Sequence, residues 1–402
     1  MSEPEESFAA RQSDNKSIIF AVGACFFAGN IVVQMHGNVV PLSFQQVFGL
    51  SEMMIGTLTG VVNLVVSLIL LLTNRFRPRF GVVTALLALA GGSVLLMQGA
   101  EAAHALWLFI LSFFAGAVFT SITKVSATKY IVVGDGQQNK SKSMAIVKTM
   151  EVLGGFTCLV LINRLSGAAM FYTMGAVVLI LSGFMLTQTR RVNRVNPEQR
   201  AEREKMSAFR ILRTWPGKAF VLLAVCFWYM GYDAMSTTFS RYAVNAWHME
   251  GNSYTVCLIV VAVSATVFYI PAARIFKKKP VLGIVIGLLL IAAGLFLTSL
   301  AQSYHVALNL LFIMIGVGWS CVAVNGVIIT AADVGEDHAG QLVSLYYVAN
   351  TLSKILAPVI SGAILEYLPY RSLYAILSLF FLLAIGFLYL GQRLHRGSVE
   401  KP

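Results

Sequence analysis

The chain has 402 residues, of which 57% are hydrophobic and only 12% are charged, and its formal net charge is +12. Soluble domains carry about a quarter of charged residues, so this composition argues against a soluble enzyme or binding domain and indicates a membrane protein. The basic residues gather in short clusters between apolar runs. We therefore attribute them to loops that follow the positive-inside rule and expect no nucleic-acid partner.

Long apolar runs fill most of the chain, and a run of about 20 residues can cross a bilayer as a helix. The acidic, polar N-terminus does not resemble a signal peptide. We predict an all-α polytopic membrane protein with about twelve spans. They lie near residues 17–40, 52–73, 81–99, 105–129, 143–164, 168–188, 218–246, 253–275, 281–301, 305–331, 341–366 and 371–391.

The distribution of basic residues predicts the orientation of these spans. Bases cluster in the loop at 75–79, at 140–142, in the connector, at 274–279 and in the tail at 393–401. The loops on the opposite side contain little beyond Arg164 and Arg371. An acidic loop at 333–337 is the one exception. We therefore expect a multi-pass protein of the inner or plasma membrane with both termini in the cytoplasm.

A basic, arginine-rich segment divides the chain into two similar halves. We predict an N-terminal six-helix bundle at 1–188, a cytoplasmic linker at 189–217 and a C-terminal six-helix bundle at 218–402. Basic loops follow the second and the eighth spans in the two halves. Two pseudo-symmetric bundles around a site at the bilayer midplane are typical of carriers that work by alternating access.

Several motifs resemble one transporter family. The first basic loop reads NRFRPRFG at 74–81, and the seventh span reads WYMGYDAMSTTFSRYAVN at 228–245. Gly316-Val317-Gly318-Trp319 and Leu345-Tyr346-Tyr347 occur further on. These segments resemble the major facilitator superfamily, and most of all its sucrose–proton symporters and glycoside–pentoside–hexuronide carriers.

The resemblance implies a gate at the first basic loop, formed here by Asn74, Arg75, Arg77 and Arg79. The family carries an aspartate at the position of Asn74. In the seventh span, Asp233 stands where relatives often have asparagine, and Ser236 stands where they often have glutamate. These two positions lie one turn apart on the same face of the helix.

Ionisable residues inside the predicted spans are the main candidates for function, because such groups are costly in a membrane unless they face a cavity or a partner. Burial disfavours the charged form of a carboxyl group, so Asp233 and Glu151 are predicted proton carriers. Glu151 has two possible partners, Lys148 one turn away on the same span or Lys124 on the preceding one. Arg241 is predicted near the outer end of its span, as a gate or as an interface anchor.

Polar and aromatic residues inside the spans are the predicted contacts for a solute. Asn30 and Gln34 recur at four-residue spacing on the first span, which suits a cavity lining or helix–helix hydrogen bonds. Lys354 follows Asn350 by one turn. The full set of predicted solute contacts comprises Asn30, Gln34, Lys124, Lys148, Tyr232, Trp319, Asn325, Tyr346, Asn350 and Lys354.

Other motifs limit the function further. The pairs Gly56/Gly60 and Gly283/Gly287 have the spacing that permits close helix contact. The five cysteines fall inside apolar runs without metal-binding spacing, and we read them as core residues. The sequence lacks a P-loop, an H-E-x-x-H motif and a G-x-S-x-G motif. We therefore expect neither an enzyme nor a cofactor or metal, and an energy source other than ATP.

These observations predict a monomeric secondary transporter of a small hydrophilic solute, with the proton as coupling ion and the lipid bilayer as its environment. Proton-coupled uptake of a sugar or glycoside is the preferred hypothesis. An organic anion is the alternative, because the bases inside the spans outnumber the acids. A membrane sensor or an intramembrane enzyme is a remote third hypothesis.

Overall fold

The computed structural model describes the backbone of residues 3–73, 79–134, 137–193, 212–332 and 336–399. Side chains are described for residues 18–70, 79–127, 146–147, 149–189, 192, 212–330, 332, 342–343 and 345–394. Within these ranges every regular element is a helix, as the apolar composition predicts. Most of the predicted linker at 189–217 and the acidic loop at 333–337 lie outside the described residues.

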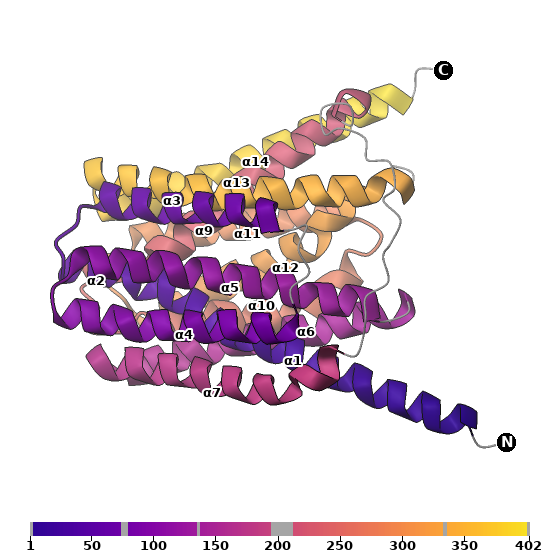
Figure 1. Cartoon of the computed structure of the whole chain (residues 1–402). Coiled ribbons are helices and arrows are strands. Elements are labelled where there is room, and N and C mark those ends of the chain that lie inside the picture. Colours follow the sequence, from indigo (N-terminus) through magenta and orange to yellow (C-terminus); the bar gives the residue numbers. More distant parts are fainter. Residues whose placement is uncertain (1–2, 74–78, 135–136, 194–211, 333–335, 400–402) are drawn as a thin grey trace. The chain divides into compact units, whose positions relative to one another are not determined.

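The helices can be followed in Figure 1. In chain order they are α1 (Glu3–Asn38), α2 (Val40–Gln46), α3 (Glu52–Thr73), α4 (Phe80–Ala102), α5 (Leu106–Gly134), α6 (Gln137–Arg164), α7 (Gly167–Asn193), α9 (Pro216–Trp247), α10 (Thr255–Ile275), α11 (Pro280–Leu300), the short 3₁₀ helix η1 (Val306–Leu308), α12 (Asn309–Ala331), α13 (Glu336–Tyr367) and α14 (Tyr370–Val399).

Eleven segments within the described residues are long and apolar enough to cross a membrane. Each of them contains most of one predicted span, so the prediction of an all-helical polytopic membrane protein is confirmed. The fifth predicted span, near 143–164, falls in α6 and is not among the eleven. Only residues 149–164 of α6 form a continuous stretch with described side chains, so the fifth span stays a prediction.

The chain forms two compact units. The first comprises residues 1–49 and 64–201, and the second comprises residues 50–63 and 202–402. In the first unit, α1 packs against α5, α6 and α7, and α4 packs against α5 and α7. In the second unit, α9 packs against α13 and α14, while α12 packs against α10 and α11. The predicted domain boundaries at 188 and 218 stay a prediction.

Glycines allow the closest helix contacts. Gly287 on α11 faces the backbone oxygen of Gly318 on α12, and a Cβ atom at Gly287 would lie 2.9 Å from the Cβ of Cys321. Gly56 and Gly60 on α3 face backbone atoms of α13, within the second unit. These contacts confirm the close approach predicted from the glycine spacing. In the first unit, Gly154 on α6 lies against the backbone of α1 in the same way.

Candidate functional site

Three predicted residues meet in the first unit. Lys124 on α5 and Glu151 on α6 form an ion pair of 2.8 Å, with 17% and 20% of their side chains exposed. Asn30 on α1 donates from Nδ2 to the Glu151 backbone oxygen at 2.7 Å, and its Oδ1 accepts from Lys124 at 3.4 Å. The structure therefore shows the pairing of Glu151 with Lys124, while the alternative partner Lys148 has a side chain outside the described residues.

Small residues make room for this cluster. A Cβ atom at Gly29 would lie 3.1 Å from the Lys124 Cε, and one at Gly155 would lie 2.6 Å from the Asn30 amide nitrogen. The Lys124 ammonium also lies 5.9 Å from the centre of the Phe26 ring. One turn along α1 from Asn30, Gln34 is half-buried and accepts a hydrogen bond of 2.9 Å from Asn38 on its own helix.

Some of the predicted residues cannot be placed. Asn74, Arg75 and Arg77, together with the side chain of Lys148, lie outside the described residues. Arg79 is exposed directly before α4. The predicted gate at this loop therefore stays a prediction that rests on the resemblance of its sequence.

Asp233 on α9 is the acid of the second unit. Its Oδ2 atom is buried and has no hydrogen-bond partner among the described residues. Lys354 on α13 lies near enough to interact with it electrostatically. Burying a charged carboxylate oxygen without a hydrogen-bond donor costs free energy. This geometry fits a protonated carboxyl group, or a carboxylate that accepts a hydrogen bond from a bound solute.

Aromatic residues surround Asp233. The rings of Tyr232 on α9 and Trp319 on α12 are stacked, with centroids 3.7 Å apart and planes inclined by 12°. Tyr229 lies edge-on to Trp319 at 5.5 Å, and its hydroxyl is 2.9 Å from the hydroxyl of Tyr346 on α13. Tyr229 and Tyr232 are both close enough to Asp233 to interact with its charge. The structure thus groups three predicted residues, Tyr232, Trp319 and Tyr346, with Tyr229 in one aromatic cluster beside Asp233.

Three further predicted contacts lie in the same unit. Asn350 on α13 has a buried Oδ1 atom without a hydrogen-bond partner among the described residues, so it retains an acceptor. Lys354, one turn further, is exposed. Asn325 on α12 is 1% exposed and donates to the Cys321 backbone oxygen at 2.8 Å. The amide group of Asn325 is therefore already engaged with its own helix.

Glu52, which the sequence did not single out, is the partner of Arg241. The two side chains form an ion pair in which Glu52 is 7% exposed and Arg241 is 1% exposed. Tyr370, at the start of α14, donates its hydroxyl to the same carboxylate. Glu52 is the first residue of the second predicted span, and no role was predicted for it. The feature of the sequence that could have identified Glu52 as a candidate is its charge at the edge of an otherwise apolar run.

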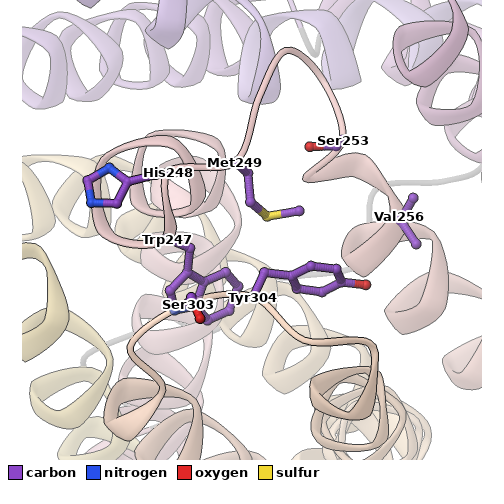
Figure 2. Close-up of a pocket in the computed structure, with 7 residues that line it drawn as sticks. All are labelled: Trp247, His248, Met249, Ser253, Val256, Ser303 and Tyr304. Atoms are coloured by element: carbon purple, nitrogen blue, oxygen red, sulfur yellow. The ribbon is translucent and has the colours of Figure 1, made fainter.

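A separate cleft lies where α9 ends. Its volume is about 340 Å³, and it is lined by Trp247, His248, Met249, Ser253, Val256, Ser303 and Tyr304. Figure 2 shows the rings of Trp247 and Tyr304 close together, with the Met249 side chain extending towards Tyr304. Trp247 donates to the Ala301 oxygen, and Ser253 donates to the Glu250 oxygen. Trp247 and Ser253 are therefore engaged within the protein.

A sequence profile of the Major Facilitator Superfamily matches residues 19–357 of the chain. The chain belongs to the Major Facilitator Superfamily. It is therefore a secondary transporter and a multi-pass membrane protein, and not an enzyme. This confirms the superfamily that the motifs resemble.

Solved structures of several transporters share the fold at low identity. A bacterial homologue of the human lysosomal transporter Spinster matches with a TM-score of 0.71 and 13% identity, covering 99% of each chain. The nucleoside transporter NupG, solved as a point mutant, matches with a TM-score of 0.76 and 11% identity, covering 93% of this chain and 99% of its own. A bacterial homologue of the human drug peptide transporters PepT1 and PepT2 matches with a TM-score of 0.71 and 11% identity, covering 96% and 100%.

These similarities establish the fold and not the solute, since identities are 13% or lower. No curated protein sequence matches the chain significantly. The branch of sucrose–proton symporters and glycoside–pentoside–hexuronide carriers, which the motifs resemble, remains a hypothesis.

Proposed function

We propose that this Major Facilitator Superfamily transporter takes up a small uncharged hydrophilic solute, a sugar or glycoside, together with protons. The observation that carries the proposal is the pairing of charges inside the spans. Lys124 pairs with Glu151, Arg241 pairs with Glu52, and Lys354 acts electrostatically on Asp233. Because each of these bases has an acid, no excess positive charge remains among them to attract an organic anion.

The organic-anion alternative now depends on one residue. With Glu52 added, four bases inside the spans, Lys124, Lys148, Arg241 and Lys354, stand against three acids, Glu52, Glu151 and Asp233. Lys148 is the base that could still supply an unbalanced positive charge, and its side chain lies outside the described residues. An anion transporter should therefore depend on Lys148, whereas a sugar transporter should tolerate the loss of its charge.

The aromatic residues around Asp233 support an uncharged ring as solute. A sugar presents an apolar face and a rim of hydroxyl groups, which suits an apolar pocket with a few convergent polar groups. The stacked Tyr232 and Trp319 supply aromatic surface, and Asp233 supplies an acceptor for hydroxyl groups. The Asn350 Oδ1 atom is a second acceptor in this unit.

Asp233 is the proton carrier that the geometry favours over Glu151. Glu151 is held by the Lys124 ammonium at 2.8 Å, which stabilises its charged form. Asp233 has a buried oxygen that no described group satisfies, so its charge state is free to follow the solute and the solvent. We assign the proton to Asp233, and we assign Glu151 to the ordering of Lys124 and Asn30.

The proposal also covers the oligomeric state, the membrane and the orientation of the chain. We propose that the protein works as a monomer in the cell membrane, with both termini and the linker at 189–217 in the cytoplasm. The basic clusters support this orientation through the positive-inside rule. Uptake is proposed because the proton gradient across such a membrane drives protons inwards.

The solute can be found by a thermal-shift screen of the purified protein against neutral sugars, carboxylates and amino acids, since a ligand of the folded state raises its melting temperature. A hit is then tested in proteoliposomes. We expect uptake of a neutral sugar to require an inward proton gradient and to resist competition by carboxylates. Competition by carboxylates, together with loss of transport in Lys148→Gln, would establish the anion alternative instead.

The role of Asp233 is tested with the same vesicles. Asp233→Asn should abolish accumulation driven by a proton gradient, while it preserves exchange of solute across the membrane without net proton movement. Glu151→Gln is the matched variant, and it should lower solute affinity but retain proton-driven accumulation. If Asp233→Asn still concentrates the solute against its gradient, Asp233 is not the proton carrier.

A further inference from the structure

The cleft where α9 ends has two anchored aromatic rings in its lining. The Trp247 Nε1 atom donates to the Ala301 oxygen at 3.2 Å, and the Tyr304 hydroxyl accepts from the Asn309 amide at 3.0 Å. The two ring centroids are 6.2 Å apart, and the ring planes are inclined by 42°. Because both side chains are held at their polar ends, the rings keep their places without a ligand. Ligand pockets are usually pre-formed in this way.

The turn after α9 brings a thioether into the same cleft. His248 ends the helix in the left-handed conformation with a φ of 55°, and the Met249 backbone nitrogen donates to the Ala243 oxygen at 3.1 Å. This conformation is unfavourable for a residue with a side chain, so the fold around it must hold it in place. Figure 2 shows the Met249 side chain extending from the turn towards Tyr304. The backbone of the turn therefore directs Met249 into the cleft.

The lining combines apolar surface with a few hydrogen-bonding groups. Two aromatic rings, a thioether and a valine supply the apolar surface, and two hydroxyl groups and an imidazole supply the polar groups. Ser253 donates to the Glu250 oxygen at 2.7 Å, and Ser303 shares a hydrogen bond of 3.2 Å with His305. A hydroxyl oxygen has two acceptor positions, so both serines can still accept from a ligand. The seven lining residues, all described by the structure, include no lysine, arginine, aspartate or glutamate. This lining suits an uncharged ligand.

The cleft is separate from the proposed solute site. Trp247 and Asp233 are 14 residues apart on α9, which is about 21 Å along a helix. A sugar or small glycoside cannot span that distance. Phe239, which lies between these two residues in the sequence, is 1% exposed and packs against Trp247. The cleft volume of about 340 Å³ is within the range of small-molecule pockets. The cleft can therefore hold a ligand of its own.

We propose that this cleft is a second binding site, which takes an uncharged glycoside with an apolar aglycone. The aglycone packs against Trp247, Met249 and Tyr304, and the hydroxyl groups of the sugar donate to Ser253 and Ser303. A free sugar leaves the apolar surface unfilled, so the cleft distinguishes a glycoside from its free sugar. The proposal rests on the proposed transport of a sugar or glycoside. It adds a site at the end of α9 that the proposed orientation places outside the cell, where the solute arrives first.

Binding is measured with a reporter beside the cleft. The five native cysteines are buried and Gln302 is exposed, so a trifluoromethyl label can be attached to Gln302→Cys in the full chain in lipid nanodiscs. The probes are the p-nitrophenyl glycosides of glucose, galactose and xylose, and the label is followed by fluorine NMR. We expect a saturable shift with at least one of them. The matching methyl glycoside should bind roughly tenfold more weakly, because it buries less apolar surface. Charged p-nitrobenzoate should cause no saturable shift.

Three variants locate the binding of the probe. Ser303→Trp places a large ring in the cleft from an exposed position, and it should weaken binding roughly tenfold or more. Val306→Trp is the matched control, because Val306 is 75% exposed and does not line the cleft. It should bind the probe like the parent. Asp233→Asn should also bind like the parent, since its substitution lies far along α9.

Several results would overturn the proposal. They are the absence of a saturable shift with every glycoside, equal affinity for p-nitroanisole, which lacks the sugar, and equal losses in Ser303→Trp and Val306→Trp. Loss of binding in Asp233→Asn would place the probe at the transport site instead. The titration involves no transport, so its result stands even if the uptake assay finds an anion as solute. A failed titration likewise leaves the uptake tests of Asp233 unaffected.

Discussion

Lys218 and Ala332 are joined by a short hydrogen bond, in which the Lys218 ammonium donates to the Ala332 backbone oxygen at 2.6 Å. The same ammonium donates to the Ile329 oxygen at 3.0 Å, and Lys218 is only 5% exposed. The two oxygens belong to the C-terminal end of α12, where backbone carbonyls lack helical partners and the helix dipole favours a positive charge. Lys218 therefore fixes the start of α9 to the end of α12.

The first prediction concerns this contact. Lys218→Met keeps roughly the length of the side chain but leaves the carbonyl groups of Ile329, which is buried, and Ala332, which is partly buried, without this donor. We expect a loss of about 1–3 kcal/mol in the free energy of unfolding, measured as a lower melting temperature of the detergent-solubilised protein. Lys278→Met is the matched control, because Lys278 is exposed, and it should melt like the parent. An equal effect of both substitutions would show that the contact contributes nothing specific.

The second prediction concerns the ion pair of Lys124 and Glu151. Glu151→Leu leaves a largely buried ammonium without its acid, which we expect to cost about 2–3 kcal/mol of stability. The double variant Lys124→Met, Glu151→Leu removes both charges and should be more stable than either single variant. Melting temperatures of the four proteins form a double-mutant cycle, and additive effects would show that the two residues are not coupled.

The third prediction concerns the contact between α11 and α12. Gly287→Ala would place a Cβ atom against the backbone oxygen of Gly318 and 2.9 Å from Val322 Cγ2. Backbone cannot yield as a flexible side chain does, so the helices must separate, at a cost of about 1–3 kcal/mol. Gly386→Ala on α14 meets no atom within 4 Å and serves as the control, with an unchanged or slightly raised melting temperature.

The helices could be predicted from the sequence because hydrophobic length is a strong signal in membrane proteins. A span needs about 20 apolar residues, and the backbone must satisfy its hydrogen bonds internally, which leaves few alternatives. Close contacts at Gly287 and Gly56 could also be predicted, since the spacing of small residues is local information.

The partners of the charged residues could be predicted only in part. Lys124 and Glu151 are separated by 27 residues, and nothing in the sequence favours this pair over the one within α6. The pair of Glu52 and Arg241 spans 189 residues and depends on how α3 packs in the second unit. Spacing along one helix cannot reveal such a pair. The charge balance derived from the sequence therefore lacked one acid.

The last prediction tests the orientation of the chain. Glu250, in the turn between α9 and α10, and Lys278, between α10 and α11, are both exposed and lie at opposite ends of α10. The positive-inside rule places Lys278, next to Lys277 and Lys279, in the cytoplasm and Glu250 outside. A membrane-impermeant maleimide should therefore label Glu250→Cys in intact cells, and it should label Lys278→Cys only after permeabilisation. The parent protein is the control, because its five cysteines are buried. The reverse labelling pattern would invert the orientation, and it would place the linker and both termini outside the cytoplasm.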